Sequence, residues 1–136
     1  LHVCPDMINL IFQIKSVDRI MLITDSVEAS GMAEGEYTLA GLPIILKDGA
    51  VRLKDQPETL AGSVLTMNAA LRNVYEITGY PLKDLIKTTS WNQAQSLGLE
   101  RVGRIQPGYA ADLAVLSGDF EVERVFVDGE ERYCAG

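Results

Sequence analysis

The chain has 136 residues, of which 47% are hydrophobic and 23% charged. This is the composition of one ordinary globular domain, and it excludes a disordered tail or a collagen-like repeat. The longest apolar run, residues 42–46, is far shorter than the roughly 20 residues of a membrane-spanning helix. The formal net charge is −7, and no basic cluster suits nucleic acid or an anionic membrane. We therefore expect neither as a partner.

Cysteine and histidine are scarce. Cys4 and Cys134 are too few for a disulfide scaffold and lack metal-pair spacing, which favours a reducing, cytoplasmic setting. His2 is the single histidine, whereas a hydrolytic metal site usually takes three protein ligands. The chain also opens without an initiator Met or a signal peptide. We therefore expect a chain that begins inside a longer protein and lacks a complete metal site.

The first half predicts a helix, a buried strand and a hairpin. Apolar residues between positions 7 and 14 have helical spacing, and Asp6 is a candidate N-cap. The apolar run 20–23, followed by Thr24 and Asp25, predicts a strand buried on both faces, as in a parallel sheet. After a polar loop, an Asp-Gly pair between apolar runs predicts a hairpin within residues 37–53. A second polar loop is expected at 54–59.

The second half predicts helices and then strands. Ser63 is expected to cap a helix over residues 64–78, and glycine to end it. Two shorter helices are expected, one from Pro81 to residue 87 and one at 91–97 capped by Ser90. Residues 112–116 predict a strand, and 122–133 a last hairpin. We expect three large side chains on the helices to be core rather than cofactor contacts: Met67, Leu71 and Trp91.

Two places could carry chemistry. Asp25, at the carboxyl end of the predicted strand, could act as a general base or acid, bind a metal, or only cap the loop. Residues 60–63 precede a predicted helix, where free N–H groups could bind an oxyanion or Ser63 could only be a cap. The position of His2 in the sequence does not distinguish a functional role from a structural one. No GxGxxG, GxxxxGK[ST] or GxSxG motif is present.

Three stretches resemble a known family. The run GRIQPGYAADLAVL at 103–116 resembles the C-terminal signature of the amidohydrolase superfamily, whose chain leaves a metal-bearing (β/α)₈ barrel for a small β-sandwich. ITDS at 23–26 with GEYTLAG at 35–41, and TLAGSVLTM at 59–67, are similar to the N-acetylglucosamine-6-phosphate deacetylase family. Together they are distributed over residues 23–116, most of the chain.

The resemblance implies a fold and a set of residue roles. The fold class would be α/β. Residues 1–102 would be the last part of a TIM-type (β/α)₈ barrel, with the hairpin 37–53 inserted, and 103–136 would be strands of the β-sandwich. The resemblance makes Asp25 the catalytic residue at the end of the eighth barrel strand. It assigns substrate contacts to His2, Leu60, Ala61 and Gly62.

The resemblance also implies an activity. The complete enzyme would hydrolyse N-acetyl-D-glucosamine 6-phosphate to D-glucosamine 6-phosphate and acetate, using a divalent metal (zinc or similar) whose ligands lie upstream of this chain. An amino sugar phosphate would be its small-molecule partner, and it would be a homo-oligomer, a dimer. We expect the isolated chain to be inactive, to bind no catalytic metal and to associate.

Two alternatives stay open. The chain could belong to another amidohydrolase, dihydroorotase-like or imidase-like. It could also be a non-catalytic module, either a remnant or a subunit that completes a partner.

Overall fold

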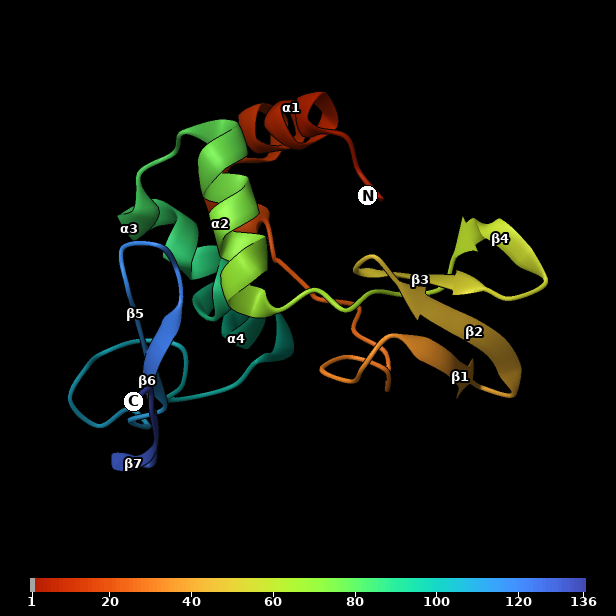
Figure 1. The fold of residues 1–136 in the computed structure, drawn as a ribbon. Coiled ribbons are helices and arrows are strands. Elements are labelled where there is room, and N and C mark those ends of the chain that lie inside the picture. Colours follow the sequence, from red (N-terminus) through yellow and green to blue (C-terminus); the bar gives the residue numbers. More distant parts are fainter. Residues whose placement is uncertain (1) are drawn as a thin grey trace. The chain divides into compact units, whose positions relative to one another are not determined.

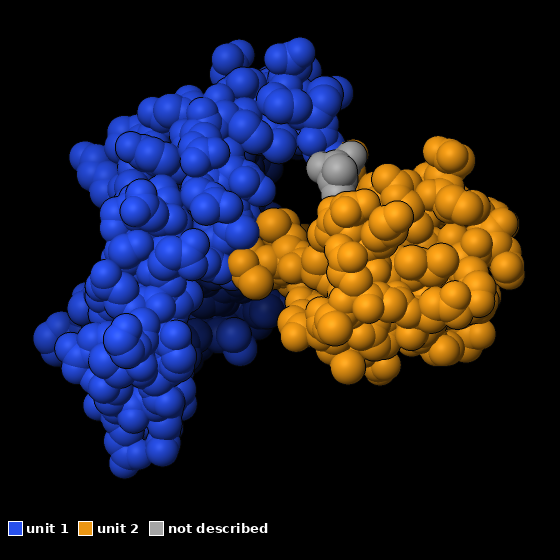
Figure 2. Space-filling model, viewed as in Figure 1, with its two compact units in different colours: residues 1, 3–22, 67–136 blue, residues 2, 23–66 orange. Residues whose placement is uncertain are grey.

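The computed structural model describes residues 2–136 and divides the chain into two compact units (Figure 2). The helical unit holds residues 3–22 and 67–136, and the hairpin unit holds His2 and residues 23–66. Each unit has its own hydrophobic core. Among the described residues, no helix is long and apolar enough to cross a membrane.

Four α-helices and two 3₁₀ turns build the helical unit. In chain order they are α1 (Pro5–Lys15), η1 (Val17–Arg19), α2 (Met67–Thr78), α3 (Leu82–Leu85), η2 (Ile86–Thr89) and α4 (Trp91–Leu97). Helix α1 packs across one end of α2 (Figure 1). The buried core of the unit is formed by Phe12, Leu71, Val74, Leu85 and Phe120.

The helical unit ends in a three-stranded antiparallel sheet of order β5-β6-β7. Its strands are β5 (Leu113–Leu116), β6 (Val122–Val127) and β7 (Glu130–Cys134). Asp128 and Gly129 join the last two strands with φ of 51° and 80°, the left-handed pair that a tight hairpin turn needs. The predicted strand and the last predicted hairpin are both confirmed.

The hairpin unit is a four-stranded antiparallel sheet of order β1-β2-β3-β4. The strands are β1 (Gly35–Leu39), β2 (Leu42–Lys47), β3 (Ala50–Leu53) and β4 (Gln56–Leu60). Ile44, Leu46 and Val51 face its core. The hairpin predicted within 37–53 is confirmed. The loop predicted at 54–59 is wrong, because β4 is an edge strand whose exposed side chains show no apolar alternation.

The strand predicted at residues 20–23 does not form. Leu22 donates its backbone N–H to Thr88 (2.8 Å), and its carbonyl accepts from the side chain of Gln93 (2.9 Å). The carbonyl of Ile20 accepts from Asn92 (2.7 Å). The polar groups that a sheet ladder would use are therefore bonded to η2 and α4, and Ile23 is 71% exposed instead of buried.

The helix ends follow the sequence signals only in part. Gly79 and Gly98 end α2 and α4 in the left-handed conformation, as expected (φ 64° and 66°). Asp6 is not the N-cap of α1, because Pro5 takes the first helical position and Asp6 lies in the first turn. Ser63 is not the cap of α2, which begins only at Met67.

The observed fold class is therefore α/β with two antiparallel sheets. The parallel sheet expected from the sequence is absent from the described residues, which contain one parallel bridge, between Ser26 and Ser63. That bridge lies directly after Asp25, the centre of the candidate site.

Leu85→Ala is expected to destabilise the helical unit by about 2–5 kcal/mol, because Leu85 is fully buried and truncation leaves a cavity. Urea unfolding of the 136-residue chain at fixed concentration, followed by the fluorescence of its single tryptophan, Trp91, measures the loss. Leu82→Ala, in the same short helix but 43% exposed, is the control. Equal losses in the two variants would contradict this packing.

Candidate functional site

Two segments far apart in the sequence pair in parallel around Asp25. Ser26 and Ser63 form the bridge. The backbone N–H of Ser63 donates to the carbonyl of Asp25 (2.8 Å), and the N–H of Val27 donates to the carbonyl of Ser63 (3.0 Å). The pairing brings Asp25 beside the residues that follow β4, the second stretch singled out from the sequence.

Asp25 has a φ of 51°, in the left-handed region that Asp48 and Asp128 also adopt in turns. Its side chain is exposed, and no described residue forms a hydrogen bond or ion pair with the carboxylate. A cap would accept a backbone N–H, so the capping alternative lacks its bond here. The carboxylate is free to accept or donate a proton toward a ligand.

Gly62 lies directly against the backbone of Asp25. A Cβ built on Gly62 would lie 3.1 Å from the carbonyl oxygen of Asp25 and 3.9 Å from its Oδ2. The same Cβ would lie 2.4 Å from Cγ1 of Val27, a distance that side chains do not tolerate. Gly62 also has a φ of 67°. Both the space and the backbone conformation therefore require glycine here.

The remaining sequence candidates lie in the same unit with different surroundings. Ala61 is buried in the core of the hairpin unit, and its N–H donates to the carbonyl of Val51 (3.0 Å). Leu60 is half-buried at the end of β4. His2 is exposed and belongs to the same compact unit as Asp25. Of these residues, Gly62 is the one that lies against Asp25, whereas Ala61 bonds to β3.

The oxyanion site considered at residues 60–63 does not form. Because α2 begins at Met67, these residues lie outside the first helical turn. The N–H of Ser63 is already bonded to Asp25, and its hydroxyl donates to the carbonyl of Thr24. The sequence around Ser63 does not indicate this use of the residue, since parallel pairing between distant segments leaves no mark in local spacing.

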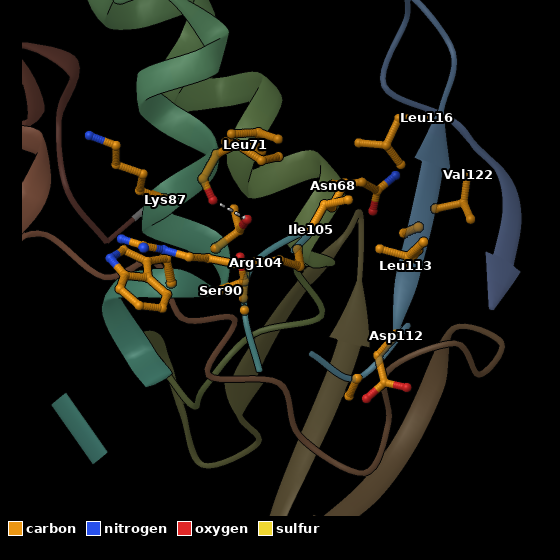
Figure 3. Close-up of a pocket in the computed structure, with 17 residues that line it drawn as sticks. Asn68, Leu71, Lys87, Ser90, Arg104, Ile105, Asp112, Leu113, Leu116 and Val122 are labelled. Atoms are coloured by element: carbon orange, nitrogen blue, oxygen red, sulfur yellow. Dashed lines mark hydrogen bonds between the residues drawn. The ribbon is translucent and has the colours of Figure 1, made fainter. Parts of the chain in front are cut away.

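A cavity in the helical unit contains none of the predicted site residues. Its volume is about 600 Å³, and α2, η2, α4 and the 103–116 segment line it (Figure 3). Met67 and Trp91 line this cavity and are half-buried, so the expectation that they are core residues is wrong. It is confirmed for Leu71, which is 2% exposed.

The charged groups around this cavity are already engaged. Lys87 donates to Asp18 (2.8 Å), and this hydrogen bond raises the pKa of Lys87, so the amine stays protonated. The guanidinium of Arg104 lies 3.3 Å from the ring centroid of Trp91. Asp112 accepts the backbone N–H of Asp128 (2.9 Å). The cavity therefore offers an apolar surface rather than a set of acid, base or nucleophile.

Comparison with known proteins identifies the family. The model of the amidohydrolase family matches residues 2–132. The chain belongs to the amidohydrolase family. Its candidate site is thus the Asp25 segment of an amidohydrolase, paired with residues 62–65.

Individual relatives agree with this assignment. The chain is 37% identical over 116 residues to N-acetylglucosamine-6-phosphate deacetylase of Lysinibacillus sphaericus, covering 85% of this chain but only 30% of that protein. It is 37% identical over 114 residues to a putative N-acetylgalactosamine-6-phosphate deacetylase of Escherichia coli K12, covering 83% of this chain and 67% of that one. The chain therefore spans less than a third of the first relative's length.

A solved structure matches the fold. It is a mutant N-acetyl-D-glucosamine-6-phosphate deacetylase from Mycobacterium smegmatis in complex with N-acetyl-D-glucosamine-6-phosphate. Its TM-score with this chain is 0.90 at 34% identity, and the match covers 96% of this chain and 35% of that one. Both the helical unit and the hairpin unit thus have counterparts in a deacetylase.

Amidohydrolases are generally metal-dependent, and the residues of this chain do not make a metal centre. Among residues 2–136, no three side chains of His, Cys, Asp or Glu gather into a group that could hold an ion. His2 is the single histidine. Asp25 alone supplies too few donors for a catalytic zinc-type site, which takes about three protein ligands.

Proposed function

We propose that this chain is the C-terminal part of a deacetylase that hydrolyses N-acetyl-D-glucosamine 6-phosphate to D-glucosamine 6-phosphate and acetate. The observation that carries the proposal is the contact of Asp25 with Gly62, in a chain that is 37% identical to such a deacetylase. An exposed carboxylate that no described residue bonds is open to a ligand, and Gly62 lets the two segments lie close together. The complete protein that contains this chain should release acetate from this sugar phosphate.

Asp25 is the proton carrier in this proposal. Its carboxylate takes a proton from the water that attacks the acetyl carbonyl, and later delivers it to the departing amine. The amine leaves poorly unless it is protonated, so one group in the right place serves both steps. The backbone at residues 60–62, together with His2, contacts the sugar. None of these steps needs a second acid or base from this chain.

The architecture of the complete enzyme is part of the proposal. Residues 1–102 belong to the end of a TIM-type barrel with the 37–53 hairpin inserted, and residues 103–136 to a β-sandwich. The metal, zinc or a similar divalent ion, is held by residues outside this chain. The complete enzyme is a cytoplasmic homodimer. The match to a solved deacetylase over 96% of this chain supports the barrel and sandwich assignment.

The 4-epimer of the sugar is a second candidate substrate. The Escherichia coli relative named for N-acetylgalactosamine 6-phosphate is as similar to this chain as the Lysinibacillus relative is, at 37% identity. Measuring kcat/KM for both epimers with the complete enzyme decides between them. The relatives reported above are deacetylases of amino sugar phosphates, which favours this substrate class over a dihydroorotase-like or imidase-like one.

The 136-residue chain on its own is expected to bind no catalytic metal, to release no acetate and to associate. Association follows from exposed apolar side chains, among them Ile105 at 90% and Ile14 at 68%. Metal analysis, an acetate assay and light scattering on the purified chain test these expectations. A monomeric, metal-loaded and active preparation would overturn all three expectations. A monomer that binds no metal and releases no acetate would overturn only the expected association.

A further inference from the structure

We propose that Ser63 is a positioning residue for Asp25: it holds both peptide groups that flank the Asp25 Cα and so fixes the direction of the carboxylate. The inference rests on the proposed deacetylase reaction, in which Asp25 carries the proton. Ser63 itself touches neither substrate nor reacting atoms in this account. It acts through the backbone of the neighbouring segment.

The hydrogen bonds of Ser63 define this role. Its hydroxyl donates to the carbonyl of Thr24, which belongs to the peptide group before Asp25. Its N–H donates to the carbonyl of Asp25, in the peptide group after it (2.8 Å). Its carbonyl accepts from the N–H of Val27 (3.0 Å). A single residue therefore restrains the rotation about both backbone bonds of Asp25.

The hydroxyl of Ser63 has a defined orientation. It accepts the backbone N–H of Leu65 (3.0 Å), so its one proton is directed to Thr24. Ser63 is half-buried, which limits competition from water. Other hydroxyl bonds in the loop are weaker anchors for Asp25: Thr24 Oγ1 accepts from Ser26 at 3.4 Å.

Asp25 needs this restraint because of its backbone conformation. A φ of 51° is less favourable than a negative φ for a residue with a Cβ, and at Asp25 Ser63 bonds both peptide groups beside the Cα. No described residue holds the carboxylate itself, so the backbone sets the position of the Cβ from which the side chain extends. If Thr24 lost its partner, the peptide before Asp25 could rotate and carry the carboxylate away from the reacting atoms.

Three variants of the complete enzyme test the role. Ser63→Ala removes the hydroxyl and keeps the backbone bonds; Ser63→Thr keeps the hydroxyl. The matched control is Ser26→Ala, since the Ser26 hydroxyl donates to Leu65 (2.8 Å) and joins the same two segments without touching a peptide group that adjoins the Asp25 Cα. Thermal melting of each variant shows whether it is folded.

We expect Ser63→Ala to lower kcat by about 10²-fold with little change in KM. Ser63→Thr should restore kcat to within about threefold of the wild type, and Ser26→Ala should stay within the same range. A folded Ser63→Ala enzyme with more than about half the wild-type kcat would overturn the inference. Equal losses in Ser63→Ala and Ser26→Ala would also overturn it, because segment pairing alone would then matter.

A readout on the 136-residue chain separates this inference from the proposed function. If the complete wild-type enzyme releases no acetate, the proposed function fails and kcat cannot be compared. NMR of the 136-residue chain then tests the positioning role of Ser63. The backbone chemical shifts of Asp25 report whether its φ stays in the left-handed region. They should change in Ser63→Ala and stay in Ser26→Ala. Unchanged shifts in Ser63→Ala would show that Ser63 does not position Asp25.

Discussion

Asp25→Asn is expected to lower kcat of the complete enzyme by about 10²–10⁴-fold, the usual contribution of a general acid–base group. Asparagine has nearly the shape of aspartate and cannot exchange a proton at neutral pH. It also tolerates the left-handed φ of 51° that Asp25 adopts. The substitution therefore removes the chemistry and leaves the backbone in place.

Asp48→Asn is the matched control for this variant. Asp48 is exposed, lies in the same unit at the β2–β3 turn and has a φ of 50°, so the chemical change and the backbone conformation are the same. Its kcat should equal that of the wild type. If folded Asp25→Asn enzyme kept more than about a tenth of wild-type turnover, a proton-transfer role for Asp25 would be untenable.

Gly62→Val is expected to raise KM of the complete enzyme about tenfold or more, equivalent to a loss of at least 1.4 kcal/mol of binding. The added Cβ would lie 2.4 Å from Val27, so the Asp25 segment and residues 60–62 must move apart. The proposal places both segments against the sugar, and their displacement weakens that contact. We therefore expect a lower melting temperature as well as the higher KM.

Gly41→Val separates the two causes. Gly41, in the β1–β2 turn, has a φ of 84°, and a Cβ there would meet nothing within 4 Å. This variant carries the backbone strain of a left-handed valine without the close approach. It should lower the melting temperature and leave KM unchanged. An unchanged KM in Gly62→Val would count against substrate contact at this position.

The sequence predicts those elements whose signals are local. Asp-Gly pairs between apolar runs predict hairpin turns, and the structure has them at Asp48–Gly49 and Asp128–Gly129. Glycine at the end of a periodic apolar pattern predicts the ends of α2 and α4. In each case the residues that form the element also supply its hydrogen bonds, so the pattern suffices.

Elements that depend on distant partners are not predictable in this way. The apolar run 20–23 has the pattern of a buried strand, yet Asn92 and Gln93 of α4 bond to its backbone. Strand β4 shows no apolar alternation, because it pairs on one side only and is exposed. Nothing within either segment indicates which distant groups will meet it.

In the candidate site, too, some features have local sequence signals and others depend on distant partners. Asp25 stands out because it follows an apolar run, and residues 60–63 stand out because they precede a predicted helix; the substrate contacts of residues 60–62 come from the family resemblance. The contact between Asp25 and Gly62, and the hydrogen bonds of Ser63 to Thr24, Asp25 and Val27, arise from the parallel pairing of the two segments. That pairing is a property of the folded unit and has no signature in the spacing of residues.

Product analysis of the complete protein tests the central claim most directly. The protein is incubated with N-acetyl-D-glucosamine 6-phosphate, and acetate and free amine are quantified against time. The account predicts equal amounts of acetate and D-glucosamine 6-phosphate. A folded, metal-supplemented protein that releases no acetate from this sugar phosphate or its 4-epimer, but opens a cyclic imide or dihydroorotate, would contradict it.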